Sequence, residues 1–131
     1  MIIPKFLDHL VFRVADLNST ERFYTAILGE PHHRSTGSLM YMAGLTRVFF
    51  TTVSRLGGDS FDKERVGMNH MAFGVSTLEE LKTIESQLRR AGISHSGVLI
   101  DDYGANEFIW LDDPDRMRVE VYLRPNQPQR T

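Results

Sequence analysis

Two histidines and one glutamate, His9, His70 and Glu120, lie in segments whose apolar residues occupy alternate positions, as they do in β-strands. Side chains of a strand alternate between its two faces, so each of these residues faces away from the apolar set of its own strand. A carboxylate buried there without a partner would be costly, and a divalent metal ion would remove that cost. Two imidazoles and one carboxylate form the facial triad typical of non-haem iron(II), and zinc, manganese and nickel also accept these ligands.

The two histidine segments are copies of one another. Residues 68–76 overlay residues 7–15 with an offset of 61 positions, so that His70 falls on His9. A repeat of this size indicates two related modules that share a surface, and the histidines would face it. A single histidine on a strand is usually structural, but two at equivalent positions with a glutamate on the same side favour a functional site.

The elements that must position these residues follow the same order in both halves: a strand, a helix, and three further strands. Helices are expected to stop at Gly29 and Gly92, and capping-box spacing predicts that they start near Asn18 (with Glu21) and near Ser76 (with Glu79). The second helix is expected to pack through a stripe of five residues: Leu78, Leu81, Ile84, Leu88 and Ala91. The strands are expected over residues 6–14, 32–35, 39–43, 47–53, 68–76, 97–100, 107–111 and 118–123.

The predicted fold class is α+β, with paired βαβββ modules whose curved mixed sheets surround a metal cleft. We expect one domain over residues 1–131, long enough to bury a real core. Its expected parts are module 1 at about 6–54, a linker at about 55–67, module 2 at about 68–123, and a loose tail at 124–131.

Composition excludes several classes of function. The net charge is −2, with acids and bases mixed along the chain. The sequence therefore has no cluster of basic residues that would bind nucleic acid or a membrane surface. Neither a bilayer-length apolar run nor a signal-peptide pattern is present, and there is no cysteine to form disulfides, bind metal or act as a nucleophile. We therefore expect a cytoplasmic protein that binds neither nucleic acid nor membrane.

Four motifs in order carry a family resemblance: the His9 strand, the helix end Phe23-Tyr24…Leu28-Gly29, the His70 strand, and Asp113-Pro114-Asp115…Glu120. Together they resemble the vicinal oxygen chelate superfamily, which includes glyoxalase I, extradiol dioxygenases, methylmalonyl-CoA epimerase, fosfomycin resistance enzymes and bleomycin resistance proteins. The resemblance covers residues 6–123 and implies the glyoxalase/bleomycin resistance/dioxygenase fold, with a cleft metal chelated by vicinal oxygens of the substrate. His9, His70 and Glu120 match the family's ligand positions.

Departures from the family patterns narrow this resemblance. No Asp or Glu occurs between Pro31 and Gly58, so the fourth ligand of the glyoxalase I and epimerase pattern is missing. Three-ligand sets belong to the dioxygenases and the fosfomycin transferases. The dioxygenase pattern is partly met, with Trp110 in place of a tyrosine, Arg116 in place of a turn glycine, and Tyr103 near the position of a catalytic histidine. No Lys or Arg lies between positions 90 and 116, which argues against an anionic phosphonate substrate.

Further residues are candidates for the cleft. Tyr103 is predicted to transfer a proton, because Asp101, Asp102 and Gly104 mark a loop that could close over the substrate. Arg13 shares the face of His9 and is predicted to hold a substrate anion, although a salt bridge at the rim would explain it equally well. The remaining predicted cleft residues, for which packing is the alternative role, are Tyr41, Phe50 and Trp110. The other histidines, His32, His33 and His95, are expected at the surface.

Two hypotheses of different classes follow. The first is a metal-dependent enzyme with one divalent ion (Fe2+, Mn2+, Zn2+ or Ni2+), which catalyses a dioxygenase-like or lyase/isomerase reaction on a small organic substrate. The second is a metal-free protein that binds or sequesters a small molecule, as bleomycin resistance proteins do. A homodimer is expected because exposed sheet must be covered, and His9 could meet His70 of its own chain or of a partner.

Overall fold

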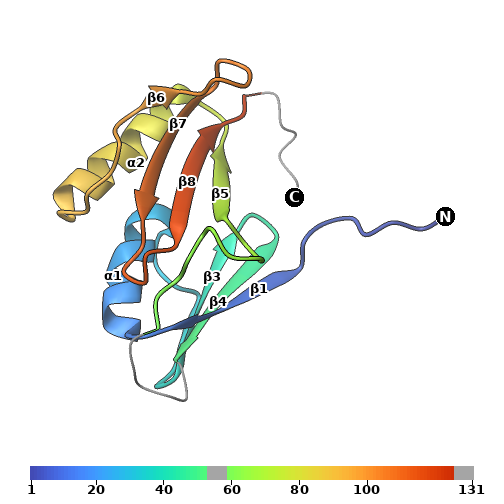
Figure 1. Cartoon of the computed structure of the whole chain (residues 1–131), viewed down its shortest axis with the longest axis vertical. Helices are drawn as coiled ribbons and strands as arrows, with labels where there is room; N and C mark the ends of the chain where they lie inside the picture. The colour runs from blue at the N-terminus through green and yellow to red at the C-terminus, as the bar shows by residue number, and fades with distance from the viewer. Residues whose placement is uncertain (53–58, 126–131) are drawn as a thin grey trace. The chain divides into compact units, whose positions relative to one another are not determined.

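The computed structural model describes residues 1–52 and 59–125, and the chain divides into two compact units. Of the described residues, 1–52 belong to the first unit and 59–125 to the second. The elements of the first unit are β1 (His9–Val14), α1 (Leu17–Leu28), β2 (His33–Arg34), β3 (Ser38–Ala43) and β4 (Thr46–Thr52) (Figure 1). Those of the second are β5 (His70–Val75), α2 (Leu78–Arg90), β6 (Leu99–Ile100), β7 (Glu107–Asp112) and β8 (Arg118–Leu123).

Each unit is built on a four-stranded mixed sheet, in the order β1-β4-β3-β2 in the first and β5-β8-β7-β6 in the second. The first strand of each unit pairs in parallel with the last, and the other pairings are antiparallel. Parallel pairing requires a crossover between the strands, and α1 and α2 lie in these crossovers. The predicted α+β class with two βαβββ modules is therefore confirmed.

The core of the first unit lies between its sheet and α1. Tyr24 of the helix packs against Phe50 of β4, with ring centroids 4.2 Å apart and ring planes tilted by 31°, and both side chains are fully buried. Tyr41 of β3 is also fully buried, and its hydroxyl bonds the Thr25 hydroxyl at 2.8 Å. Residues of β1 alternate as predicted, with Leu10, Phe12 and Val14 on the more buried face and His9, Val11 and Arg13 on the exposed one.

The core of the second unit follows the same plan. Leu81 and Leu88 of α2 are fully buried, as are alternate residues of two strands, Ile109, Leu111, Val119 and Val121. The predicted apolar stripe of this helix is only partly right, because Leu78 at its first position is exposed. In β8 the alternation turns Glu120 away from the helix, onto the open face of the sheet.

Both helices begin at residues other than the predicted ones. The N-cap of α1 is Asp16, whose carboxylate accepts from the backbone N–H groups of Asn18 and Ser19, so the expected cap at Asn18 is wrong. The N-cap of α2 is Thr77, which forms a capping box with Glu80, one residue later than expected. In both cases an equally good or stronger acceptor lies within two residues of the predicted one.

The predicted strand boundaries hold to within a few residues in the described chain. Parts of three predicted segments lie outside the described residues: residues 53–54 at the end of module 1 (Val53 ends a predicted strand), residues 55–58 of the linker, and residues 126–131 of the tail. Residues 59–69 form neither helix nor strand. Neither helix of the described chain has the length and apolar content to cross a membrane.

Candidate metal site and pocket

His70 and Glu120 lie together on the open face of the second sheet. They are on neighbouring strands, where Glu120 is opposite Ala72 and His70 is two residues away along β5. His70 Nε2 is 3.5 Å from Glu120 Oε1. The side chain of Glu120 is only 12% exposed and that of His70 is 41% exposed, so the carboxylate is largely shielded from water while the imidazole stays accessible.

This separation suits two ligands of one metal ion. Nitrogen and oxygen ligands that each lie about 2.1 Å from a tetrahedral ion are about 3.4 Å apart. Within either unit, however, the described residues do not bring three His, Asp or Glu side chains together in a group that could hold an ion. The second unit therefore offers one pair of candidate ligands, and a three-ligand site would need a further side chain from outside that unit.

His9 is the first residue of β1 in the first unit. Its Nδ1 lies 2.8 Å from Asp8 Oδ2, and its ring makes an edge contact with Phe49, with centroids 6.0 Å apart. The other carboxylate oxygen of Asp8 is 3.5 Å from the guanidinium of Arg47, the residue opposite His9 in β4. With Nδ1 engaged, Nε2 is the nitrogen of His9 that is left to bind a metal.

A turn fixes the start of β8 and so the position of Glu120. The buried Asp113 carboxylate accepts from the N–H groups of Asp115 and Met117, at 2.8 and 2.9 Å. Arg116 adopts the left-handed conformation (φ 68°) and donates its N–H to the Asp113 carbonyl. An arginine thus occupies the turn position where the resemblance to the dioxygenases implies a glycine, and the turn still forms.

A pocket of about 560 Å3 opens beside the His70–Glu120 pair. It is lined by His70, Leu99, Ile100, Asp101, Asp102, Tyr103, Phe108, Glu120 and Tyr122. Phe108 and Tyr122 stack with centroids 5.0 Å apart and form an aromatic part of its wall. Three carboxylates line the pocket and none of these lining residues is a lysine or arginine, so the wall has an apolar and acidic character.

The loop between β6 and β7 forms part of this wall. Asp101 and Asn106 close it through two hydrogen bonds, from Asp101 N–H to the Asn106 carbonyl and from Asn106 N–H to the Asp101 carboxylate. Tyr103 at its tip is 95% exposed, so the residue predicted to transfer protons lines the pocket but is freely hydrated. Burial, together with a hydrogen bond to the Asp101 carboxylate, raises the pKa of Tyr122, which keeps that phenol protonated.

Two more predicted cleft residues lie on open sheet faces. Trp110 is opposite Glu120 in β7, and the Arg118 guanidinium covers its ring at 4.1 Å while also donating to Asp112 at 3.2 Å. Arg13 is exposed in the first unit and donates to the Thr52 carbonyl at 2.9 Å. Both arginine head groups therefore already have partners within their own sheets.

Three predictions about individual side chains are wrong. Tyr41 and Phe50 do not line a cleft, because strand alternation turns both towards α1, where they are fully buried in the core. His95 is half-buried rather than solvated, and its Nδ1 accepts a hydrogen bond from Gly97 N–H at 3.0 Å. Sequence reasoning did not single out Phe108 and Tyr122, although their two-residue spacing from Trp110 and Glu120 places them on the same face.

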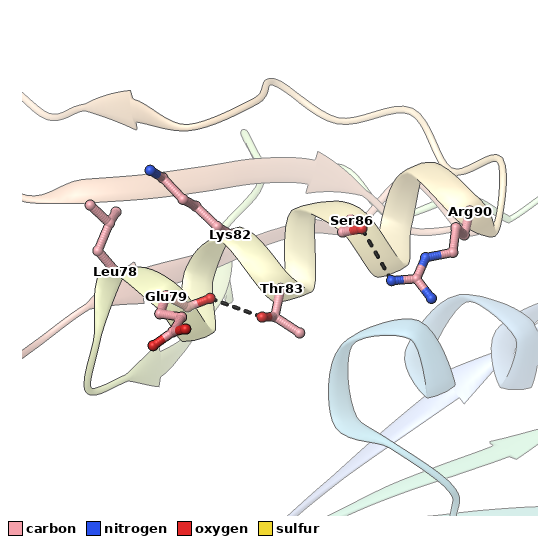
Figure 2. A pocket seen from close by; sticks show the side chains of 6 residues that line it. All are labelled: Leu78, Glu79, Lys82, Thr83, Ser86 and Arg90. Atoms are coloured by element: carbon pink, nitrogen blue, oxygen red, sulfur yellow. Dashed lines mark hydrogen bonds between the residues drawn. The ribbon is translucent and has the colours of Figure 1, made fainter.

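A second pocket, with a volume of about 480 Å3, lies along one side of α2 (Figure 2). Its lining residues are Leu78, Glu79, Lys82, Thr83, Ser86 and Arg90. Thr83 donates to the Glu79 carbonyl and Arg90 donates to the Ser86 hydroxyl, so two of its polar groups bond within the helix. The lining residues of this pocket include no histidine, and they form no histidine–carboxylate pair like His70 and Glu120 in the first pocket.

Comparisons with known proteins agree with this architecture. Residues 6–121 match the family model of the Glyoxalase/Bleomycin resistance protein/Dioxygenase superfamily. A search of curated proteins gives no match. A glyoxylase/bleomycin resistance protein/dioxygenase domain from Frankia sp. EAN1pec superposes with a TM-score of 0.76 at 23% identity, covering 92% of this chain and 98% of that one.

Two further solved structures are similar. A putative glyoxalase from Bacillus halodurans gives a TM-score of 0.77 at 22% identity, over 92% of this chain and 96% of that one. The fosfomycin resistance protein FosX from Listeria monocytogenes gives 0.67 at 21% identity, over 92% and 90%. That structure is of a mutant in complex with Mn(II) and 1S,2S-dihydroxypropylphosphonic acid. At these identities the likeness concerns the fold.

Proposed function

The chain belongs to the Glyoxalase/Bleomycin resistance protein/Dioxygenase superfamily, and from that premise we propose that it is a metal-dependent enzyme. His9, His70 and Glu120 are the proposed ligands of one divalent ion, with His9 supplied by the same chain or by a partner. The substrate is a small organic molecule that chelates the ion through vicinal oxygens. The reaction belongs to the dioxygenase-like or the lyase/isomerase type.

The observation that carries this proposal is the 3.5 Å approach of His70 Nε2 to the shielded carboxylate of Glu120. A shielded carboxylate needs a partner, and a cation between these two atoms would satisfy both. The Mn(II) in the FosX structure supports a divalent ion at this kind of fold. When bound, such an ion supplies Lewis-acid polarisation of a substrate oxygen.

The pocket residues have defined tasks in this proposal. Phe108 and Tyr122 pack against the apolar body of the substrate and exclude water from it. Tyr103 is proposed to exchange a proton with the substrate from its place on the loop, and Trp110 and Arg13 to contact the substrate from the open sheet faces. Because lysine and arginine are absent from the lining residues described, this wall favours an uncharged or cationic group of the substrate.

A metal-free binding protein of the bleomycin resistance kind is the second candidate. The specific observation that favours it is the same wall, since aromatic and carboxylate side chains can hold an apolar or cationic ligand without any chemistry. The two candidates differ in whether His70 and Glu120 bind a metal ion.

Metal content separates these candidates. The protein is purified without chelators, and its bound metals are quantified by elemental analysis, together with His70→Ala and Glu120→Gln. We expect about one divalent ion per chain in the parent and little or no bound metal in either variant, because each variant lacks one proposed ligand. The matched controls are His32→Ala and Glu79→Gln, at exposed positions that the proposal does not use. A parent that binds no metal, or variants that bind it as the parent does, would overturn the enzyme proposal.

A further inference from the structure

The residue before each histidine contacts the ring nitrogen that the proposed metal does not use. We propose that Asn69 and Asp8 are positioning residues, which fix the tautomer and the ring orientation of His70 and His9 so that Nε2 of each is the metal-binding nitrogen. This inference rests on the proposed function, because it concerns the same ligands. Strand alternation alone predicts no role for either of these two side chains.

The orientation of the Asn69 amide is determined by its other partner. Asn69 Nδ2 lies 2.9 Å from the backbone carbonyl of Lys63 and donates to it. A carbonyl oxygen only accepts hydrogen bonds, so the amide nitrogen must be on that side. The amide oxygen Oδ1 therefore faces His70 Nδ1, 2.7 Å away.

The two contacts of the His70 ring then decide where its proton lies. Asn69 Oδ1 can only accept, so the short 2.7 Å contact requires a proton on Nδ1. The contact of Nε2 with Glu120 is 3.5 Å, at the limit of a hydrogen bond, and competes weakly for that proton. In the neutral ring Nε2 thus presents its lone pair towards Glu120, and two electron-rich atoms that face each other are the arrangement a cation would bridge.

In the first unit, Asp8 makes the equivalent contact with the ring of His9. His9 Nδ1 lies 2.8 Å from Asp8 Oδ2, and a carboxylate oxygen accepts that proton. Asp8 is held in turn by Arg47, through its other carboxylate oxygen and through its backbone carbonyl, which accepts the Arg47 N–H at 2.8 Å. A carboxylate or an amide oxygen on the far nitrogen of a histidine is the usual outer contact of a metal-bound imidazole.

Local structure makes these contacts possible. Neighbouring side chains inside a strand point to opposite faces and would not meet. His9 and His70 are each the first residue of a strand, so Asp8 and Asn69 lie in the preceding loops and can turn back towards the ring. The repeat therefore preserves a pair of residues, Asp8-His9 and Asn69-His70, rather than a histidine alone.

Nitrogen NMR of the metal-free protein tests the tautomers directly. Long-range 15N–1H correlations at about pH 8.5, where an ordinary imidazole is neutral, report which ring nitrogen carries the proton. We expect protonated Nδ1 in both His9 and His70 of the parent. In Asn69→Ala the His70 proton should move to Nε2, whereas Asn69→Asp, which keeps an acceptor, should leave it on Nδ1. Asp8→Ala should act on His9 alone.

The matched control is Asn18→Ala, an exposed asparagine of α1, which should change neither ring. Protonated Nε2 in the parent protein, or a tautomer of His70 that is the same in Asn69→Ala and in the parent, would overturn the proposal. Because this measurement needs no metal, its result is independent of whether the proposed function is right.

Affinity for Co(II), measured by its ligand-field absorption, tests the consequence. We expect Asn69→Ala to weaken binding by about 10- to 100-fold and Asn69→Asp to restore it to within a few-fold of the parent. Equal affinity of the parent and Asn69→Ala would overturn the positioning role. A parent that binds no Co(II) or other divalent ion would refute the proposed function, and the NMR result would then still decide whether Asn69 sets the tautomer.

Discussion

Thr20 is a buried polar residue of α1, and its hydroxyl oxygen has no hydrogen-bond partner among the described residues. A buried group without a partner has lost its hydration and gained nothing in return. Thr20→Val replaces that hydroxyl by a methyl group of similar size. We expect the free energy of unfolding to rise by about 1 kcal/mol, measured by urea denaturation.

The matched control is Thr25→Val in the same helix. The Thr25 hydroxyl bonds the Tyr41 hydroxyl at 2.8 Å, so this variant removes the shorter of two hydrogen bonds of that buried phenol and leaves it only its 3.3 Å bond to the Glu21 carbonyl. It should lower the free energy of unfolding by about 1 kcal/mol. Two variants with equal effects would mean that the Thr20 hydroxyl is bonded in solution.

At the residue scale, alternation within a single strand was enough to predict on which face of the sheet a side chain lies. Alternation correctly turned His70 and Glu120 onto the open face, because every second neighbour is apolar. Tyr41 and Phe50 were placed wrongly, since an aromatic residue fits a core and a cleft equally well and only the partner, α1, decides. The role of Asn69 depends on the Lys63 carbonyl, a contact that no sequence period encodes.

At the scale of elements, the capping box of α2 is a test of local stability. Thr77→Ala removes the acceptor for Glu80 N–H and should cost about 1 kcal/mol of unfolding free energy. Asn18→Ala at α1 should change it by no more than about 0.5 kcal/mol, because Asp16 is the cap there. Both are measured by thermal and urea unfolding followed by circular dichroism, and a larger loss in Asn18→Ala would contradict the observed caps.

A second element, β2, is tied to α1 by the ion pair of Arg34 with Glu21. The hydrogen bonds from Arg34 lower the pKa of Glu21 below its ordinary value of 4.5. A lowered pKa in the folded state means that this pair stabilises the fold above that value, and that its contribution is lost as the pH falls through the folded-state pKa.

Glu21→Gln should therefore flatten the acid side of the stability curve. Free energies of unfolding measured between about pH 3 and pH 7 should differ between parent and variant near neutral pH and converge at the acid end. Because the pair lies at the surface, the difference should be smaller than that of Thr77→Ala. Glu79→Gln serves as the control, and a difference that grows towards acid pH would refute the assigned sign.

Element order was predictable from the sequence and element starts were not. Ser76 with Glu79 and Thr77 with Glu80 have the same capping spacing, so the sequence offers two starts that differ by one residue. In the structure the N-cap is Thr77, Leu81 and Leu88 lie in the core, and Leu78 in the first turn is exposed. Packing against the sheet decides between registers that local propensity leaves equivalent.

At the scale of the whole molecule, we expect a homodimer, and the metal proposal leaves two ways to complete the site. His9 belongs to one unit and the His70–Glu120 pair to the other, so the three ligands could come from one chain or from two. Mixing two inactive variants, His9→Ala and Glu120→Gln, after unfolding and refolding them together, distinguishes these cases. The mass of the parent in solution, measured by light scattering, tests first whether the protein is a dimer.

If each site takes its ligands from two chains, a mixed dimer combines an intact His9 with an intact Glu120 and regains one site. Equal amounts of the two variants should then bind about one metal ion per mixed dimer, although neither variant alone binds. If each site forms within one chain, the mixture should bind no more metal than the separate variants. Elemental analysis after refolding, with the parent refolded in parallel, reads out both cases.

The parallel pairing of the first and last strands of each unit sets an order in which the chain can acquire its ligands during synthesis. In the described chain, β1 has β4 as its neighbour in the sheet and β5 has β8. The strand of His9 can dock once residue 52 has been translated. His70, by contrast, is synthesised early in its unit, but its strand can pair only after Arg118–Leu123 has been translated. A truncated product that ends before β8 would contain His70 without Glu120 and without the strand that pairs with β5, so it should lack the proposed ligand pair of the second unit.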